Sequence, residues 1–98
     1  MDITYNLHDI TFVWDEGKAK QNKLKHGVTF EESAEVFFDP FIKVLDASQN
    51  FEEREAIIGL NEKWELLFVV YAETLKEAIR IISACDATRQ ERLDYENG

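Results

Sequence analysis

The sequence predicts an α+β domain in which helices pack on an antiparallel sheet, and three observations support this fold class. Helix-capping signals bracket residues 15–26 and 29–38, so two helices are expected to follow one another. Residues 41–83 form β-branched and aromatic runs joined by short turns, which indicates antiparallel strands. The segment 78–96 reads as a strand that turns directly into a helix. We therefore expect a single domain, 1–98, with the order β-α-α-β-β-β-β-α.

The N-terminal residues, 1–9, are mostly polar and are expected to form an irregular lead-in. Residues 10–14, Ile-Thr-Phe-Val-Trp, are β-branched and aromatic, which predicts the first strand. Asp15 is a suitable N-cap for a helix that runs to His26, and Gly27 can adopt the left-handed conformation that stops it. The first strand and the first helix are thus expected to be directly connected.

This first helix has only two apolar residues, Ala19 and Leu24, so a hydrophobic stripe does not explain how it packs. One interpretation is a solvated helix held to the domain by Trp14, Ala19 and the aliphatic stems of its lysines. The alternative is that its polar side faces an active cleft. That side is expected to contain Asp15, Lys18, Ala19, Asn22 and His26, with Lys25 at its border.

The second helix, 29–38, is predicted from the capping-box spacing of Thr29 and Glu32. Asp39-Pro40 is expected to end it, because the residue before proline is pushed out of the helical region. The face expected to enter the core consists of Phe30, Ala34 and Phe37.

Four further strands are expected at 41–46, 54–60, 64–72 and 78–83. The run 64–72 is almost wholly apolar, so we expect it to be the central strand, flanked by 54–60 and 78–83. Gly59 indicates either a bulge or a close approach to a neighbouring element. The polar and acidic segment 47–53 is expected to be a mobile loop.

The last strand contains one charged residue, Arg80, which needs a partner or an open face in such an apolar run. The helix that follows is expected to begin near Asp86 or Thr88, and Thr88 has capping-box spacing with Glu91. Two guanidinium groups and a phenol are expected close to the end of that strand. They belong to Arg89, Arg92 and Tyr95.

Composition limits the classes of function. A net charge of −9 and a pI of about 4.6 argue against nonspecific nucleic-acid binding by the whole surface, although a local basic site remains compatible. The single cysteine, Cys85, excludes an internal disulfide and favours a reducing cytoplasm. The N-terminus lacks the features of a signal peptide, and no apolar run reaches membrane-spanning length.

Several motifs, taken together and in order, resemble the signature of the BrnT family. In the N-terminal half they are Phe12-x-Trp14-Asp15, Lys18, Asn22, Lys25-His26-Gly27-Val28-Thr29-Phe30-Glu31-Glu32, Phe37 and Asp39-Pro40. In the C-terminal half they are Ile58-Gly59, Arg80-Ile81-Ile82-Ser83-Ala84 and Ala87-Thr88-Arg89-x-Glu91-Arg92, with Tyr95. The resemblance covers about residues 10–96, which is nearly the whole chain.

The resemblance implies a RelE-like fold and a ribonuclease toxin of a type II toxin–antitoxin pair. It also implies neutralisation by a BrnA-like antitoxin, contact with DNA only through that antitoxin, and a possible dimer within the complex. No cofactor, metal or membrane is expected. The sequence departs from the family pattern after Ile-Ser-Ala, where a basic pair is usual and Cys85 and Asp86 stand here. This departure removes positive charge beside the expected phosphate site.

Metal-free cleavage of RNA uses the ribose 2′-OH as nucleophile and needs a proton shuttle and a phosphate clamp. With the resemblance, Arg80 is expected as the clamp, or else as the partner of a carboxylate within the sheet. His26 is expected as the shuttle, or else as a cation at a helix C-terminus. Arg89 is expected to extend the clamp. Further RNA contacts are expected at Lys18, Lys25, Arg92 and Tyr95, for which ordinary surface roles are the alternative.

Two other functions remain open. A degenerate toxin could persist as an antitoxin-binding co-repressor, which Cys85, Asp86 and the acidity favour. A stand-alone RNA-binding domain is the third candidate, but the chain lacks the exposed aromatic and basic pattern of such domains. The acidic helix face of Glu31, Glu32 and Glu35 is either solvated or binds a basic partner.

Overall fold

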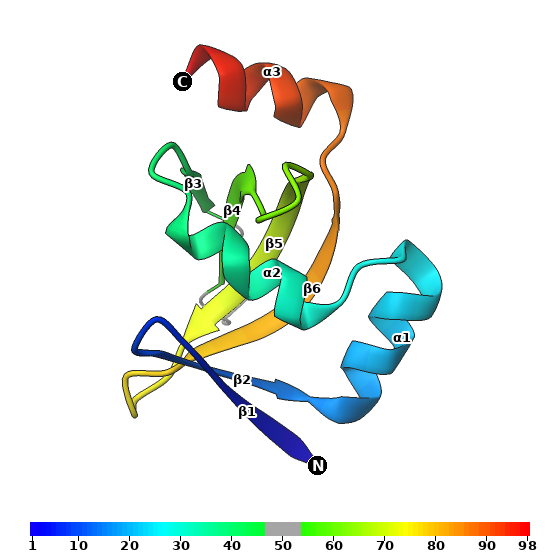
Figure 1. The fold of residues 1–98 in the computed structure, drawn as a ribbon, viewed down its shortest axis with the longest axis vertical. Coiled ribbons are helices and arrows are strands. Elements are labelled where there is room, and N and C mark those ends of the chain that lie inside the picture. The colour runs from blue at the N-terminus through cyan, green and yellow to red at the C-terminus, as the bar shows by residue number, and fades with distance from the viewer. Residues whose placement is uncertain (47–53) are drawn as a thin grey trace.

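In the part of the chain that the structure describes, one six-stranded sheet carries three α-helices (Figure 1). The computed structural model describes residues 1–46 and 54–98, so the loop expected at 47–53 lies outside the described residues. The elements are β1 Asp2–Leu7, β2 Ile10–Asp15, α1 Glu16–His26, α2 Phe30–Glu35, η1 Val36–Phe38, β3 Lys43–Asp46, β4 Glu55–Leu60, β5 Leu66–Glu73, β6 Ile79–Asp86 and α3 Arg89–Asn97. The strand order across the sheet is β1-β2-β6-β5-β4-β3. The α+β class is confirmed.

The prediction that residues 1–9 are irregular is wrong, because they form β1 and its turn into β2. The chain order therefore begins β-β-α. Every second residue of β1 is half-buried, and Ile3, Tyr5 and Leu7 pack against the core. This alternation is the ordinary pattern of a strand with one solvated face, but the intervening polar residues conceal it. Both turn residues, His8 and Asp9, have positive φ angles of 49° and 67°, as a two-residue hairpin turn requires.

The sheet is mixed, which corrects the expectation of a wholly antiparallel one. β2 and β6 are parallel, with Phe12 opposite Ile79 and Val13 opposite Arg80, whereas the other four pairings are antiparallel. The parallel pair joins two strands that are separated in the chain by α1, α2 and the β3–β5 strands. Short turns between neighbouring strands predict the antiparallel pairs, but they carry no information about this long connection.

β5 is the central strand, between β4 and β6, as predicted from its apolar run. It begins at Leu66 and ends at Glu73, two residues later and one residue further than predicted. Trp64 is instead part of the β4–β5 turn, with a φ angle of 63° and a side chain that is 80% exposed.

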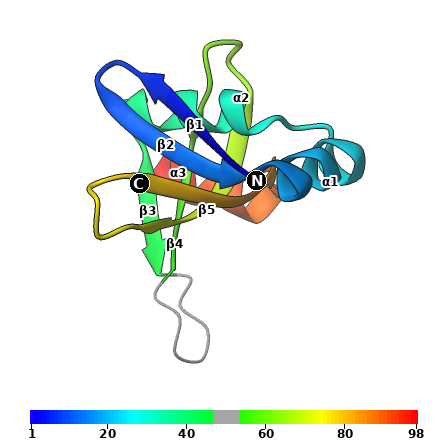
Figure 2. The ribbon, with the colours of Figure 1, turned by 90° about the horizontal axis from the view of Figure 1, so that it is seen from below.

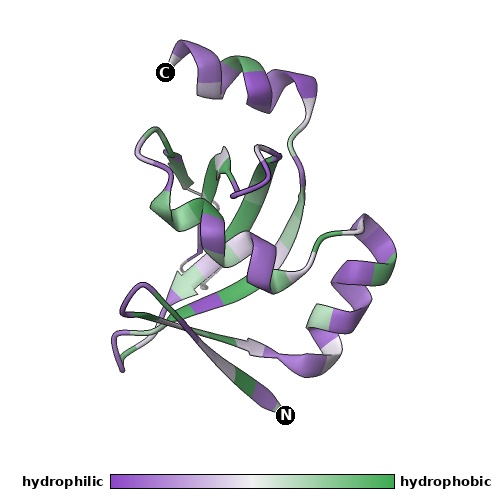
Figure 3. Ribbon diagram, viewed as in Figure 1, coloured by the Kyte–Doolittle hydropathy of each residue, from purple (hydrophilic) through white to green (hydrophobic). Residues whose placement is uncertain are grey.

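The core lies between α2 and one face of the sheet (Figure 2). Hydrophobic residues follow the central strands, whereas α1 and α3 are mostly hydrophilic (Figure 3). The capping box of Thr29 and Glu32 is present, and the predicted second helix is α2 extended by the 3₁₀ turn η1. The largest buried side chains of this core are Trp14, Phe12, Phe30, Ile57, Leu67, Ile81 and Val36.

Gly59 marks a close approach, which is one of its two predicted roles. A Cβ atom built there would lie 2.8 Å from Ile42 Cγ2 and 2.9 Å from Val36 Cγ1. The other predicted role, a bulge, is not found at Gly59. The register shift lies instead between Val70 and Tyr71 of β5. The absence of a side chain at Gly59 therefore lets η1 and the start of β3 pack directly on β4.

Candidate functional site

The most basic element of this acidic protein is α1. Four of the 11 lysines and arginines lie on it, at Lys18, Lys20, Lys23 and Lys25, against one acidic residue, Glu16. Asp15 accepts a hydrogen bond from the backbone of Lys18 and caps the helix, and Gly27 ends it with a φ angle of 73°. Both predicted boundaries are confirmed.

Three exposed basic side chains of α1 have no hydrogen bond or ion pair with the rest of the described chain: Lys18, Lys25 and His26. By contrast, Lys20 pairs with Glu16 at 3.5 Å, and Lys23 Nζ donates to the Gly27 carbonyl at 3.3 Å. The residues selected from the sequence are thus the basic side chains of α1 that remain available to a ligand.

A buried asparagine holds α1 beside β6. The Asn22 side chain is 7% exposed and donates to the carbonyls of Val28, at 3.0 Å, and Ala84, at 2.9 Å. Its Oδ1 accepts from the Ala84 backbone N–H at 3.1 Å. The Asn22 amide therefore pairs with the backbone of β6 at Ala84, beyond the point where the pairing of β2 with β6 ends. Sequence reasoning placed Asn22 on the polar side of the helix but assigned it no role. The feature that could have indicated its packing role is an asparagine in a helix that has no apolar stripe.

α3 begins immediately beyond β6. Thr88 forms the predicted capping box with Glu91, and Arg89 and Arg92 are exposed without a side-chain partner in the described ranges. Arg89 is five residues from Ala84, which is at most about 17 Å of extended chain. α1 and the first turn of α3 thus flank the C-terminal end of β6 (Figure 1). We call the exposed side chains of Lys18, Lys25, His26, Arg89 and Arg92 the basic face.

Arg80 lies at the other end of β6. It is separated from Asp86 by about 20 Å along the strand. Its guanidinium donates to both carboxylate oxygens of Asp2, at 2.8 and 3.4 Å, and this pairing raises the pKa of Arg80 and lowers the pKa of Asp2. The carboxylate pairing expected as the alternative role is therefore present. The structure does not bring Arg80 together with Arg89 and Arg92.

Tyr95 anchors α3 to the segment that follows η1. Its hydroxyl donates to Asp39 Oδ2 at 2.6 Å, and burial together with this bond raises the pKa of Tyr95 to about 12. Asp39 also accepts from the backbone N–H groups of Leu60 and Phe41. Partial burial opposes ionisation of Asp39, but these hydrogen bonds outweigh it and lower the pKa of the carboxyl. Sequence reasoning used Asp39 as a helix stop and as part of the family resemblance, and assigned it no contact with Tyr95.

Cys85 and Asp86, where the resemblance implies a basic pair, end β6. Cys85 is half-buried, and burial, followed by the charges of Glu91 and Asp86, raises the pKa of its thiol. A thiol with a raised pKa is a poor nucleophile at neutral pH. Asp86 is exposed and adds negative charge between α1 and α3.

The described residues form neither a metal-binding cluster nor a membrane-spanning helix. No group of three histidine, cysteine or acidic side chains among them could hold a metal ion. None of the helices in residues 1–46 and 54–98 is long and apolar enough to cross a membrane.

Comparison with known proteins identifies the family. A family model described as the ribonuclease toxin BrnT of the type II toxin–antitoxin system matches residues 14–91. The crystal structure of the Brucella abortus ribonuclease toxin BrnT matches with a TM-score of 0.60 and 26% identity, over 78% of this chain and 94% of that one. A comparison with curated proteins gave no match. Since the family match spans most of the chain, the protein belongs to the BrnT family of ribonuclease toxins of type II toxin–antitoxin systems.

Proposed function

We propose that this chain cleaves RNA at its basic face by metal-independent attack of the ribose 2′-OH, and that a BrnA-like antitoxin neutralises it in the cytoplasm. The observation that carries the proposal is the unpaired cationic surface of α1 in a protein of net charge −9. A local excess of positive charge attracts phosphates even when the whole protein is acidic. DNA contact belongs to the antitoxin.

The side chains of the basic face divide three tasks in this proposal: phosphate binding, charge stabilisation and proton transfer. Lys18, Lys25 and Arg92 hold phosphates. Arg89 stabilises the charge that develops on the phosphorane, because a guanidinium stays charged and binds two oxygens at once. His26 moves the proton, because an imidazole ring has one nitrogen that can accept a proton and one that can donate it. Tyr95, predicted as a further RNA contact, acts in this proposal by holding α3 in place through Asp39.

Arg80 is proposed as a second phosphate contact, further along the RNA strand. Its pair with Asp2 uses two N–H donors and leaves the other three of the guanidinium for a ligand. The Arg80 and Asp2 side chains are 38% and 56% exposed, so a phosphate can reach the pair.

Purified variants test the proposed role of His26 in the basic face. His26→Ala is expected to lower cleavage of total RNA by about 10²-fold or more. His8→Ala is the matched control, because His8 lies in the β1–β2 turn, away from α1 (Figure 1). Equal loss in both variants, or no loss in His26→Ala, would refute the assignment.

Salt dependence tests the lysines. Binding of an RNA analogue that lacks the attacking 2′-OH should weaken in Lys18→Ala and Lys25→Ala. The slope of log K against log salt should fall by about 0.7 for each phosphate that the variant no longer neutralises. Lys76→Ala, an exposed lysine of the β5–β6 turn, should leave the slope unchanged.

Arg80 needs a control that separates phosphate binding from structure. Arg80→Ala and Asp2→Asn both break the ion pair, but only Arg80→Ala removes a phosphate-binding group. We therefore expect Arg80→Ala to weaken RNA binding and growth inhibition, and Asp2→Asn to leave both largely intact. Equal effects of the two variants would assign Arg80 a purely structural role.

A second function, that of a weakened toxin acting as a co-repressor with its antitoxin, is favoured by Cys85 and Asp86. The half-buried thiol and the exposed carboxylate stand where the family usually has two cations. Replacing them as Cys85→Arg with Asp86→Lys should raise cleavage by restoring positive charge between α1 and α3. If this variant cleaves RNA and the wild type does not, the chain is a weakened toxin. If both are inert while the antitoxin complex still binds operator DNA, the co-repressor function is correct.

A further inference from the structure

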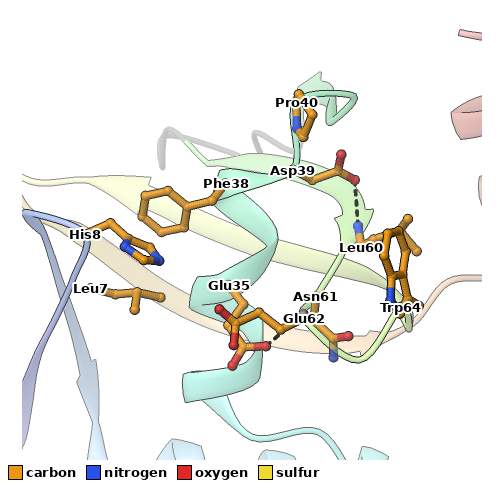
Figure 4. Close-up of a pocket in the computed structure, with 10 residues that line it drawn as sticks. All are labelled: Leu7, His8, Glu35, Phe38, Asp39, Pro40, Leu60, Asn61, Glu62 and Trp64. Atoms are coloured by element: carbon orange, nitrogen blue, oxygen red, sulfur yellow. Dashed lines mark hydrogen bonds between the residues drawn. The ribbon is translucent and has the colours of Figure 1, made fainter.

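A hollow of about 320 Å³ lies between two hairpin turns and η1 (Figure 4). Leu7 ends β1 and His8 begins the β1–β2 turn. Phe38 comes from η1, and Leu60 and Trp64 come from the β4–β5 segment. Its lining is mainly apolar and aromatic. We call it the apolar pocket.

Both turns that form the apolar pocket are held in fixed shapes. Asn61 ties the β4–β5 turn, since its Oδ1 accepts from the backbone of Lys63 and Glu65, both at 2.9 Å, and its backbone N–H donates to the Glu65 carbonyl. Within this turn Trp64 is 80% exposed and has a positive φ angle, a conformation that costs free energy in a non-glycine residue. On the other side the ring of His8 packs edge-on against Phe38, with ring centroids 4.8 Å apart. An exposed tryptophan in a fixed turn is typical of a binding anchor.

The rim of the apolar pocket is negative. Glu35, Asp39 and Glu62 line it, and no lysine or arginine does. Glu35 Oε1 accepts from the Glu62 backbone at 3.1 Å, which fixes one carboxylate on the rim. The Glu62 carboxylate itself has no hydrogen bond or ion pair with any described residue, so its charge is available to a partner.

We infer that the apolar pocket binds a segment of the antitoxin that presents a large apolar side chain flanked by lysine or arginine. This inference rests on the proposed function, which supplies the antitoxin. The negative rim excludes RNA as the occupant, because phosphates would be repelled. It also disfavours a second copy of this chain, which would bring another net charge of −9 to the same surface.

A second hollow, between β1, α1 and α2, is the rival docking site. It is larger, about 650 Å³, and Leu24 at its edge is 88% exposed. Its rim carries Lys20 and Lys23 together with Glu16 and Glu31, so the charges are mixed. Lys20 and Glu16 already neutralise each other. This hollow therefore lacks the uniform charge that would select a basic segment.

The test uses the toxin co-expressed with the protein encoded beside it. Trp64→Ala is expected to weaken the purified complex by about thirtyfold or more, the usual effect of losing a tryptophan anchor. Glu62→Lys should weaken it about tenfold, with the largest effect at low salt, and a lysine or arginine to glutamate change in the partner should restore binding. The β5–β6 turn supplies both matched controls, Leu75→Ala and Glu77→Lys, because both residues are exposed and neither lines the pocket.

The outcomes separate this inference from the proposed function. If the wild type forms a complex and both Trp64→Ala and Glu62→Lys bind as tightly, the docking site is wrong while the antitoxin assignment stands. If Leu24→Ala weakens the complex instead, the second hollow is the site. If the wild type binds no neighbouring protein, the antitoxin assignment fails and this inference fails with it. Circular dichroism melts of the variants without partner should match the wild type, because Trp64 and Glu62 are exposed.

Discussion

Replacing Asn22 should destabilise the protein more than any other polar substitution on α1. The Asn22 side chain, which is 7% exposed, ties this helix to β6 through two hydrogen bonds with Ala84 and makes a third with the Val28 carbonyl. In Asn22→Ala, the N–H and C=O of Ala84 and the C=O of Val28 are left without these partners. Both Ala84 groups point to the sheet edge away from β5, so no strand can replace the amide.

The size of the effect follows from these three groups. A buried backbone group left without a partner costs about 1–3 kcal/mol, and water entering at the sheet edge reduces that cost. We expect the free energy of unfolding to fall by about 3 kcal/mol in total. For a domain of this length, such a decrease lowers the melting temperature by roughly 12–20 °C.

Thermal and urea unfolding followed by circular dichroism measure this change. Gln21→Ala is the matched control, because Gln21 is the exposed neighbour on the same helix and should alter stability by less than about 0.5 kcal/mol. Asn22→Asp should remain destabilised, since it keeps the acceptor for Ala84 but places a carboxylate against two carbonyls. If Asn22→Ala melts within a few degrees of Gln21→Ala, α1 is not held by this amide and the assigned role of Asn22 is refuted.

Three further substitutions test other parts of the fold. Gly59→Ala should cost about 1–3 kcal/mol in urea unfolding, because its new methyl group would overlap two neighbouring side chains. Tyr95→Phe should cost about 1 kcal/mol at pH 7 and less at pH 3. The pKa of Asp39 is lowered on folding, so its contribution to stability is complete above about pH 4 and is lost as the pH falls through the folded-state value; a cost that does not change with pH would contradict this. Cys85 should react with a disulfide reagent more slowly in the folded than in the unfolded protein at pH 8, because burial raises its pKa; equal rates would show that the thiol is open to solvent.

Local signals in the sequence predicted most of the elements. Both capping boxes, the stop at Gly27 and the central position of β5 are confirmed, because each depends on neighbouring residues or on one continuous apolar run. The errors concern pairings between distant segments. β1 was missed since its polar face conceals the alternation, and the parallel pairing of β2 with β6 has no local signature.

The same distinction explains the candidate site. The cations of α1 could be predicted because they lie on one helix. The partner of Arg80 could not, since Asp2 belongs to β1, whose polar face makes it look irregular in the sequence. The attachment of α1 through Asn22 likewise joins residues 62 positions apart. The assignment of catalytic roles remains a prediction for the variants described above.

The position of α3 links the two proposed surfaces. Its first turn carries Arg89 and Arg92 of the basic face, and Tyr95 near its other end is bonded to Asp39 on the rim of the apolar pocket. The helix is about 13 Å long. A partner seated in the pocket therefore blocks RNA only if it continues along α3 as far as Arg89. A peptide limited to the docking segment should bind without preventing cleavage, whereas one extended by three helical turns should inhibit. Inhibition by the short peptide would mean that the pocket and the cleavage site are the same surface.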